Sequence, residues 1–176
     1  MVSYWADGPT DVSIRDICER AGVSKPGLYR EFGGDDALKT AVLDLYQMHV
    51  LTPFHDMLAS DLTFEQMIDH AIVSVVQDRQ GLPNGCLYVS MYERKAQLGQ
   101  HTRQKVEDIQ KITLRRYEEY IERAKSKLQF RKDISSPIAA IYLDAQMNSA
   151  LRMQKEGVSR ETISDFLRFA LSQLQV

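Results

Sequence analysis

Residues 13–32 read SIRDICERAGVSKPGLYREF, a stretch that predicts two short helices joined by a tight turn. Ser13 and Asp16 fit a capping box, in which a hydroxyl and a carboxylate bind the free N–H groups of a helix start. Gly22 stands where the first helix must end, because glycine adopts the left-handed conformation at little cost. Ser24 is suited to cap the second helix. This layout fits a helix-turn-helix, whose second helix is compact enough to enter the major groove of DNA.

The apolar residues of the stretch are spaced as packing of the two helices requires. The first helix carries an apolar stripe at helical spacing. Leu28 and Phe32 would pack the second helix onto the first, and Val23 would fill the turn. The alternative is a plain helical hairpin inside an all-α core, which the spacing alone leaves open.

Residues 13–46, SIRDICERAGVSKPGLYREFGGDDALKTAVLDLY, resemble the DNA-binding segment of the TetR family of bacterial transcriptional regulators. The most specific parts are AGVSKPGLYREF and the following ALKTAVL. The GCL at residues 85–87 also resembles the start of a body helix in many relatives. The resemblance implies an all-α homodimer with a DNA-reading head and a C-terminal domain that binds a small effector.

This head departs from the family pattern in charge and in length. Residues 1–46 contain five basic and eight acidic side chains, which is unfavourable for binding phosphates. The segment before Gly8 is short, so we expect a truncated first helix, with Trp5 covering the core of the head. Asp35 stands where the family usually carries a phosphate-gripping lysine, and Lys39 would compensate only in part. These features support the alternative of a helical small-molecule-binding or interaction module that has lost DNA binding.

Outward residues of the predicted second helix are suited to contact DNA. Lysine and arginine bind phosphates or guanine edges, and a tyrosine hydroxyl reaches a phosphate. A dimer would place two such helices in successive major grooves of a pseudo-palindromic site. The residues expected at the DNA are Ser13, Arg15, Ser24, Lys25, Gly27, Leu28, Tyr29, Arg30 and Lys39.

The predicted fold class is all-α, with a helix-turn-helix DNA-binding domain over residues 1–46 and a helical effector-binding and dimerisation domain over residues 47–176. In the resembled family, body helices surround an effector cavity. Methionine adapts its shape and tyrosine adds a polar group to an apolar wall, which suits a small, largely apolar effector. The residues expected to line the cavity are Met57, Phe64, Met67, Tyr88, Met91, Tyr92, Tyr117 and Tyr120. The same residues would also suit a plain core.

The last two predicted helices, near residues 138–156 and 159–174, are apolar over more than one face. A surface helix needs only one apolar stripe. A wider stripe suggests that two antiparallel helices meet their copies in a four-helix interface. The residues expected in the dimer interface are Tyr142, Met153, Phe166 and Phe169. The alternative is burial within one subunit.

Composition excludes several classes of protein. No apolar run approaches the roughly 18 residues of a membrane span, so no membrane partner is expected. Cys18 and Cys86 form no disulfide framework and suit a reducing cytoplasm. No catalytic or metal-ligand spacing occurs, so we expect no enzyme, no cofactor and no metal. The resemblance to the TetR family implies a transcriptional regulator, and we expect a repressor. The expected partners are double-stranded DNA, a small-molecule effector and a second copy of the chain.

Three minor alternatives stay open in the sequence. His49 and His55 flank Pro53, where they could hold a metal ion. Cys86 lies near a predicted helix start, where a thiolate is favoured and the residue could act as a redox sensor. The basic span 101–132 is interpreted as a solvated helix face, but it could be a second nucleic-acid surface.

Overall fold

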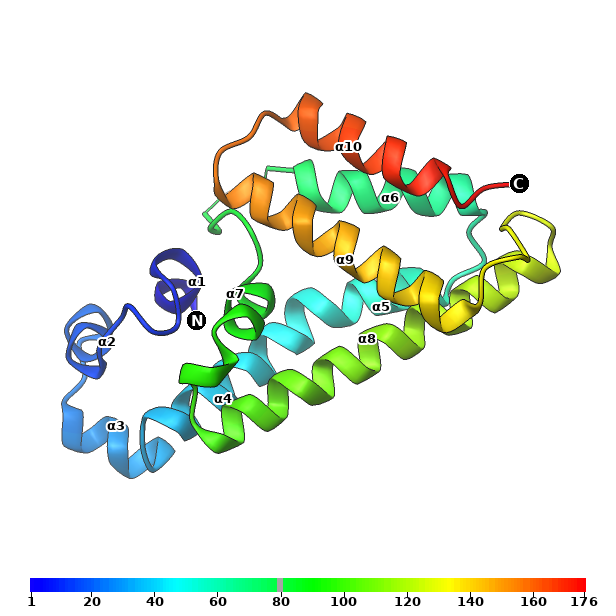
Figure 1. The fold of residues 1–176 in the computed structure, drawn as a ribbon. Helices are drawn as coiled ribbons and strands as arrows, with labels where there is room; N and C mark the ends of the chain where they lie inside the picture. The colour runs from blue at the N-terminus through cyan, green and yellow to red at the C-terminus, as the bar shows by residue number, and fades with distance from the viewer. Residues whose placement is uncertain (79–80) are drawn as a thin grey trace. The chain divides into compact units, whose positions relative to one another are not determined.

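The computed structural model describes residues 1–78 and 81–176 (Figure 1). Within these residues the regular elements are helices, and β geometry is confined to an isolated bridge between Phe130 and Gln175. The predicted all-α fold is therefore confirmed. The chain forms two compact units. Unit 1 combines Met1–Leu51 with Cys86–Ile109, and unit 2 combines Thr52–Gly85 with Gln110–Val176.

Unit 1 contains the predicted helix-turn-helix and the helices that support it. Its elements are α1 (Val2–Asp7), α2 (Ile14–Ala21), α3 (Lys25–Phe32), α4 (Asp35–Tyr46), the π-helical turn η1 (Gln47–Leu51), α7 (Leu87–Glu93), the 3₁₀ turn η2 (Lys95–Gln97) and the first part of α8 (Gln100–Ser126). Helix α7 packs against both α1 and α4. The unit is thus assembled from two distant parts of the chain.

The core of unit 1 is built around Trp5 and Tyr46, each 1% exposed. Their rings meet edge to face, with centroids 5.0 Å apart, a favourable geometry for aromatic pairs. The Tyr46 hydroxyl donates a hydrogen bond to Cys86 Sγ over 3.1 Å. The prediction that Trp5 covers the core of the head is confirmed. Cys86 is a buried partner of Tyr46, and this position does not favour a reactive thiol.

The segment that links the head to the body is helical over the whole of residues 35–51, the range that its apolar spacing favours. Helix α4 covers Asp35–Tyr46, and the π-helical turn continues it to Leu51, directly before α5 begins at Thr52. Gln47 has helical φ and ψ of −57° and −47°, so the backbone does not break at the end of α4. The change of helical geometry therefore precedes Pro53, which lies in the first turn of α5.

Unit 2 is a helical bundle of α5 (Thr52–Ala59), α6 (Phe64–Val76), the remainder of α8, α9 (Ser136–Lys155) and α10 (Arg160–Ser172). Helix α10 packs against both α6 and α9, and the three lie side by side in Figure 1. A capping box of Thr63 and Gln66 starts α6, as predicted. No helix in the described part of the chain is both long and apolar enough to span a membrane.

Aromatic rings dominate the core at one end of unit 2. Phe64 meets Phe130 edge to face at 5.1 Å and stacks with Tyr120 at 6.4 Å between centroids. Arg123 Nη2 donates a hydrogen bond to the carbonyl of Leu58 over 2.5 Å, which ties α8 to α5.

The division into a DNA-binding domain over residues 1–46 and an effector-binding domain over residues 47–176 stays a prediction. Those domains were defined by function, whereas the two units are defined by compactness.

Candidate nucleic-acid interface and ligand sites

The predicted caps of α2 are all present. Ser13 Oγ accepts a hydrogen bond from Asp16 N over 3.2 Å, and Asp16 Oδ2 accepts one from Ser13 N over 3.0 Å. Gly22 takes the left-handed conformation with φ 66° and ψ 28°. The chain therefore turns sharply at Gly22 and enters α3 three residues later, at Lys25, as a helix-turn-helix requires.

Local interactions also fix the start of α3. Ser24 Oγ accepts a hydrogen bond from Gly27 N over 3.2 Å. A Cβ atom at Gly27 would lie 3.0 Å from that hydroxyl oxygen, so glycine leaves the cap undisturbed. Leu28 is 5% exposed and anchors the helix from beneath.

Two apolar residues of the motif are more exposed than predicted. Val23 is 47% exposed and Phe32 is 38% exposed. Val23 lies in the short turn between α2 and α3, and Phe32 is the last residue of α3. The expectation that these side chains hold the two helices together is wrong. Helix α3 is held instead by Leu28 and by its contacts with α2 and α4.

The outer face of α3 presents unneutralised positive charge. Lys25 and Arg30 are exposed, and neither forms an ion pair with another residue that the structure describes. Lys25 Nζ lies 5.6 Å from the ring centroid of Tyr29, which is 40% exposed. These three side chains are free to meet phosphates or base edges without first breaking a salt bridge.

Two residues expected at the DNA are placed unfavourably for contact. Leu28 is buried, so it supports α3 from beneath and does not form part of the reading surface. Lys39 is 9% exposed, its Nζ lies 2.7 Å from Asp35 Oδ2, and the ring of Tyr4 lies beside it. A lysine held in this way has no free charge for a phosphate. Burial of its aliphatic stem and the i,i+4 spacing to Asp35 explain the pairing.

The remaining expected residues are accessible. Arg15 pairs with Glu19 over 2.9 Å, but both side chains are largely exposed. Such a pair contributes little free energy, so Arg15 can exchange its partner for a phosphate. Ser13 and Ser24 are exposed at the starts of α2 and α3, where helix N-termini favour anions.

The acidic composition of the head is largely accounted for by internal contacts. Asp7 pairs with Arg20 over 2.5 Å, and Asp16 caps α2. Asp35 pairs with Lys39, and Asp36 caps the start of α8. These carboxylates are committed to contacts within unit 1, but two of the pairs also use Arg20 and Lys39, so the head keeps its net acidic charge.

Among these acidic residues, Asp36 accepts several hydrogen bonds from the start of α8. Its carboxylate accepts hydrogen bonds from the backbone N–H groups of His101 and Thr102, both over 3.0 Å, and from Thr102 Oγ1 over 2.5 Å. Burial alone would raise the pKa of Asp36, but the hydrogen bonds from Thr102 and His101 lower it to about 2. The side chain therefore joins α4 to the start of α8.

We expect Asp36→Ala to lower the free energy of unfolding by about 2–3 kcal/mol, because it leaves buried donors unpaired. The pKa of Asp36 is depressed from 3.8, so its contribution is present above about pH 4 and lost as pH falls towards 2. Denaturant unfolding at several pH values measures both effects. Asp44→Ala breaks an exposed ion pair with Lys105 on α8 and no buried hydrogen bond, so it is the control and should cost less than about 1 kcal/mol. Equal losses in the two variants would contradict the assignment.

The eight residues expected at an effector cavity do not form one group within either unit. Met57, Phe64, Met67, Tyr117 and Tyr120 belong to unit 2, whereas Tyr88, Met91 and Tyr92 belong to unit 1. Most are buried, and four belong to the hydrophobic core of unit 2. Tyr120 has a buried hydroxyl without a hydrogen-bond partner in the described residues. The assignment of these residues to a ligand stays a prediction.

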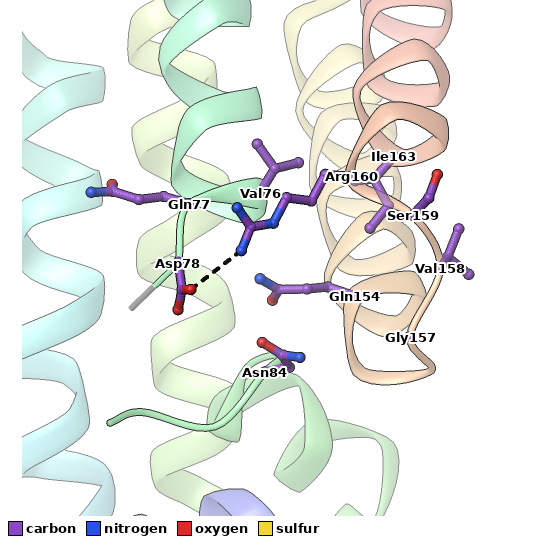
Figure 2. Close-up of a pocket in the computed structure, with 10 residues that line it drawn as sticks. All are labelled: Val76, Gln77, Asp78, Asn84, Gln154, Gly157, Val158, Ser159, Arg160 and Ile163. Carbon is purple, nitrogen blue, oxygen red and sulfur yellow. Dashed lines mark ion pairs between the residues drawn. The ribbon is translucent and has the colours of Figure 1, made fainter. Parts of the chain in front are cut away.

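A separate pocket of about 240 Å³ lies beside the end of α6 and the loop between α9 and α10 (Figure 2). Arg160 Nη2 lies 3.5 Å from Asp78 Oδ2 across it. Gln154 donates to the Val75 carbonyl and accepts from Gly85 N. The lining residues are Val76, Gln77, Asp78, Asn84, Gln154, Gly157, Val158, Ser159, Arg160 and Ile163. None of the eight expected ligand residues is among them.

One polar group in the bundle was not identified from the sequence. Asp144 on α9 is partly buried, and Asn148 Nδ2 donates to its Oδ2 over 3.0 Å. Burial raises the pKa of Asp144 to about 6, although the hydrogen bond from Asn148 lowers it. An acid among apolar residues on a helix gives no sequence signal for burial, because its environment depends on the neighbouring helices.

The histidine alternative finds no support in the described residues. His55 is buried, and its Nε2 lies 3.0 Å from Thr113 Oγ1. Burial and the nearby Arg116 lower the pKa of His55. Over residues 1–78 and 81–176 no group of three His, Cys, Asp or Glu side chains is arranged to hold a metal ion.

The two C-terminal helices leave large apolar side chains exposed. Phe169 on α10 is 72% exposed, and Ile138 and Ile141 on α9 are 61% and 55% exposed. Of the other residues expected in the interface, Tyr142, Met153 and Phe166 are partly buried against the core of unit 2. Exposed apolar groups of this size on two packed helices are typical of an association surface.

Comparison with known proteins agrees with this architecture. Residues 3–42 match the model of the family described as "Bacterial regulatory proteins, tetR family". No curated protein sequence matches the chain. The matched residues span α1 to the middle of α4, so they include the whole helix-turn-helix.

Solved structures extend the similarity to the whole chain at the level of the fold. A TetR regulator from Chloroflexus aurantiacus has a TM-score of 0.82 at 16% identity, covering 99% of this chain and 91% of that one. A TetR family regulator from Agrobacterium tumefaciens has a TM-score of 0.81 at 13% identity, covering 96% and 90%. A cysteine mutant of the TetR family regulator CifR, solved with a 26-bp double-strand operator DNA, has a TM-score of 0.80 at 19% identity, covering 97% and 90%.

The resemblance read from the sequence is therefore confirmed. The N-terminal segment matches the tetR family model, and the whole chain has the fold of TetR-family transcriptional regulators.

Proposed function

We propose that this protein is a transcriptional repressor that binds a pseudo-palindromic operator as a homodimer and is released by a small, largely apolar effector. The observation that carries the proposal is the outer face of α3, where Lys25, Tyr29 and Arg30 are exposed and neither cation forms an ion pair with the residues that the structure describes. The caps at Ser13, Gly22 and Ser24 support it, because they present this face on a rigid turn. The operator DNA in the CifR structure supports the same use of the fold.

In this proposal residues 1–46 read DNA and residues 47–176 bind the effector and the second copy. Lys25 and Arg30 bind guanine edges or phosphates, and Tyr29 donates to a phosphate. Ser13, Arg15 and Ser24 contact the DNA backbone, while Gly27 allows close approach. The effector acts only as far as it binds the released conformation more tightly than the DNA-bound one.

Selection of fragments from the source genome on the purified chain tests the proposal. Salt must be stated and varied, because phosphate contacts make the affinity fall as salt rises. The expected result is enrichment of a pseudo-palindromic sequence whose half-sites lie about one helical turn apart. If no fragment is enriched even at low salt, the chain is not a DNA-binding regulator and the interaction-module alternative stands.

The dimer gives a separate prediction at Phe169. Phe169→Glu is expected to weaken self-association by about 100-fold or more, because it buries an unpaired charge in an apolar interface. Folding should be nearly unchanged, since the side chain is 72% exposed in the single chain. Sedimentation equilibrium measures the association. Leu128→Glu, at a position 66% exposed outside α9 and α10, is the control, and a dimer unaffected by Phe169→Glu would place the interface elsewhere.

A further inference from the structure

The pocket in Figure 2 lies within unit 2 and holds one charge of each sign. Its volume is about 240 Å³, and Asp78 and Arg160 are the charged residues among the described residues that line it. Arg160 Nη2 lies 3.5 Å from Asp78 Oδ2, and the two side chains are 66% and 71% exposed. An exposed pair of this kind contributes little free energy. A ligand that brings an opposite charge to each group can therefore replace the pair at little cost.

A second pair of arginine and aspartate joins α10 to α6 outside the pocket. Arg168 Nη2 lies 2.7 Å from Asp69 Oδ1 and donates a hydrogen bond to it. The pair inside the pocket is longer, and no hydrogen bond joins Arg160 to Asp78 in the part of the chain that the structure describes. Both charges of the pocket thus have only a weak partner and are available to a ligand.

Local contacts hold the walls of the pocket in place. Gln154 on α9 donates a hydrogen bond to the carbonyl of Val75 and accepts one from Gly85 N over 2.8 Å. Ser159 caps α10, because its Oγ accepts a hydrogen bond from Thr162 N over 3.1 Å. The end of α6, the segment at Gly85 and the start of α10 are therefore positioned around the pocket before a ligand binds, which lowers the cost of binding.

Apolar side chains form another part of the lining. Ile163 on α10 is 1% exposed and belongs to the hydrophobic core of unit 2. Val76 and Val158 are partly buried against the same core. Sites for small molecules commonly combine an apolar wall with a few polar groups that fix the orientation of the ligand. Here the two polar anchors carry opposite charges, so the ligand that fits both is a zwitterion.

We propose that this pocket binds an α-amino acid with a small aliphatic side chain. The carboxylate of the amino acid pairs with Arg160, and its ammonium group pairs with Asp78. The aliphatic side chain lies against Val76, Val158 and Ile163. Arg160 is the first residue of α10, so the carboxylate also meets the positive end of the helix dipole. A ligand with one charge would separate the pair and leave the other residue without a partner.

Three probes that share an isobutyl group separate the two charges. L-Leucine carries both charges, 4-methylpentanoate carries only the carboxylate, and 3-methylbutylamine carries only the ammonium group. Their dissociation constants for the full chain are measured by ligand-observed NMR at neutral pH. Asp78→Asn and Arg160→Gln each remove one charge of the pocket. Asp69→Asn and Arg168→Gln make the same changes in the pair outside the pocket and are the matched controls.

L-Leucine is expected to bind the natural chain at least about fivefold more tightly than either singly charged probe, and each pocket variant should lose a similar factor. The loss should follow the charge that was removed. Asp78→Asn should no longer prefer leucine to 4-methylpentanoate, and Arg160→Gln should no longer prefer it to 3-methylbutylamine. The control variants should bind leucine as the natural chain does. Melting temperatures should change little, because both residues of the pocket are largely exposed.

Two results would overturn the inference. One is the absence of leucine binding to the natural chain, and the other is an equal loss of leucine binding in the pocket variants and in the controls. The inference does not rest on the proposed function, and the site is separate from the eight residues predicted for the apolar effector. A chain that binds no leucine can still enrich a palindromic operator, and a chain that binds leucine without enriching DNA keeps this site and loses the role of repressor.

Discussion

Replacing both Tyr29 and Arg30 by alanine is expected to weaken binding to the selected operator by at least about 100-fold. Each good base or phosphate contact contributes about 1–3 kcal/mol, and a dimer loses each contact twice. Both side chains are exposed on α3, so the melting temperature and the dimer should be nearly unchanged. Fluorescence anisotropy with the operator fragment at fixed salt measures the loss.

Arg115→Ala is the matched control for this variant. It removes one exposed positive charge from α8, as the double variant removes one from α3. Binding that survives in Tyr29→Ala/Arg30→Ala but falls in Arg115→Ala would move the interface to the basic span 101–132. Unaltered operator binding in both variants would show that α3 does not contact the operator. Only loss confined to the double variant agrees with the site described above.

Trp5→Ala is expected to lower the free energy of unfolding of the head by about 3–5 kcal/mol, the range for deleting a large buried aromatic side chain. Trp5 is 1% exposed and meets Tyr46 at 5.0 Å, so its loss leaves a cavity in the core of unit 1. Denaturant unfolding followed by far-UV circular dichroism measures the change, since Trp5 is the chain's single tryptophan. Operator binding should fall with it, because α3 depends on the same core.

Two further substitutions define the cause of this loss. Trp5→Phe keeps an aromatic ring against Tyr46. It should therefore lose less than half as much free energy of unfolding as Trp5→Ala. Phe32→Ala truncates an aromatic residue that is 38% exposed and should cost less than about 1 kcal/mol. A loss at Trp5 no larger than the loss at Phe32 would mean that α1 contributes little to the head.

The helix-turn-helix could be predicted because its determinants are local. The cap at Ser13, the left-handed Gly22 and the cap at Ser24 act over three or four residues, and each was found as predicted. Burial could not be predicted in the same way. Val23 and Phe32 have apolar side chains but lie largely at the surface, at 47% and 38% exposed, because burial depends on which elements cover a side chain and not on its apolar character alone.

Charges were the least predictable part of the site. Lys39 was expected at a phosphate, yet its Nζ pairs with Asp35 and its stem is covered. Asp36 joins α4 to residues 65 and 66 positions later in the chain, a contact without any sequence pattern. Burial raises the pKa of Asp144, and no local sequence pattern indicates that burial.

The amino-acid sequence alone specified the all-α class, the helix-turn-helix and the outward face of α3, because helical periodicity and capping depend on residues close together in the chain. The availability of each charge was set by tertiary contacts. Lys39, which the sequence predicted at the DNA, is covered and paired with Asp35, and Asp36 is committed to the start of α8. Burial on α9 raises the pKa of Asp144. Ionisation and exposure depend on which groups meet across the fold, and residues distant in sequence supply those groups.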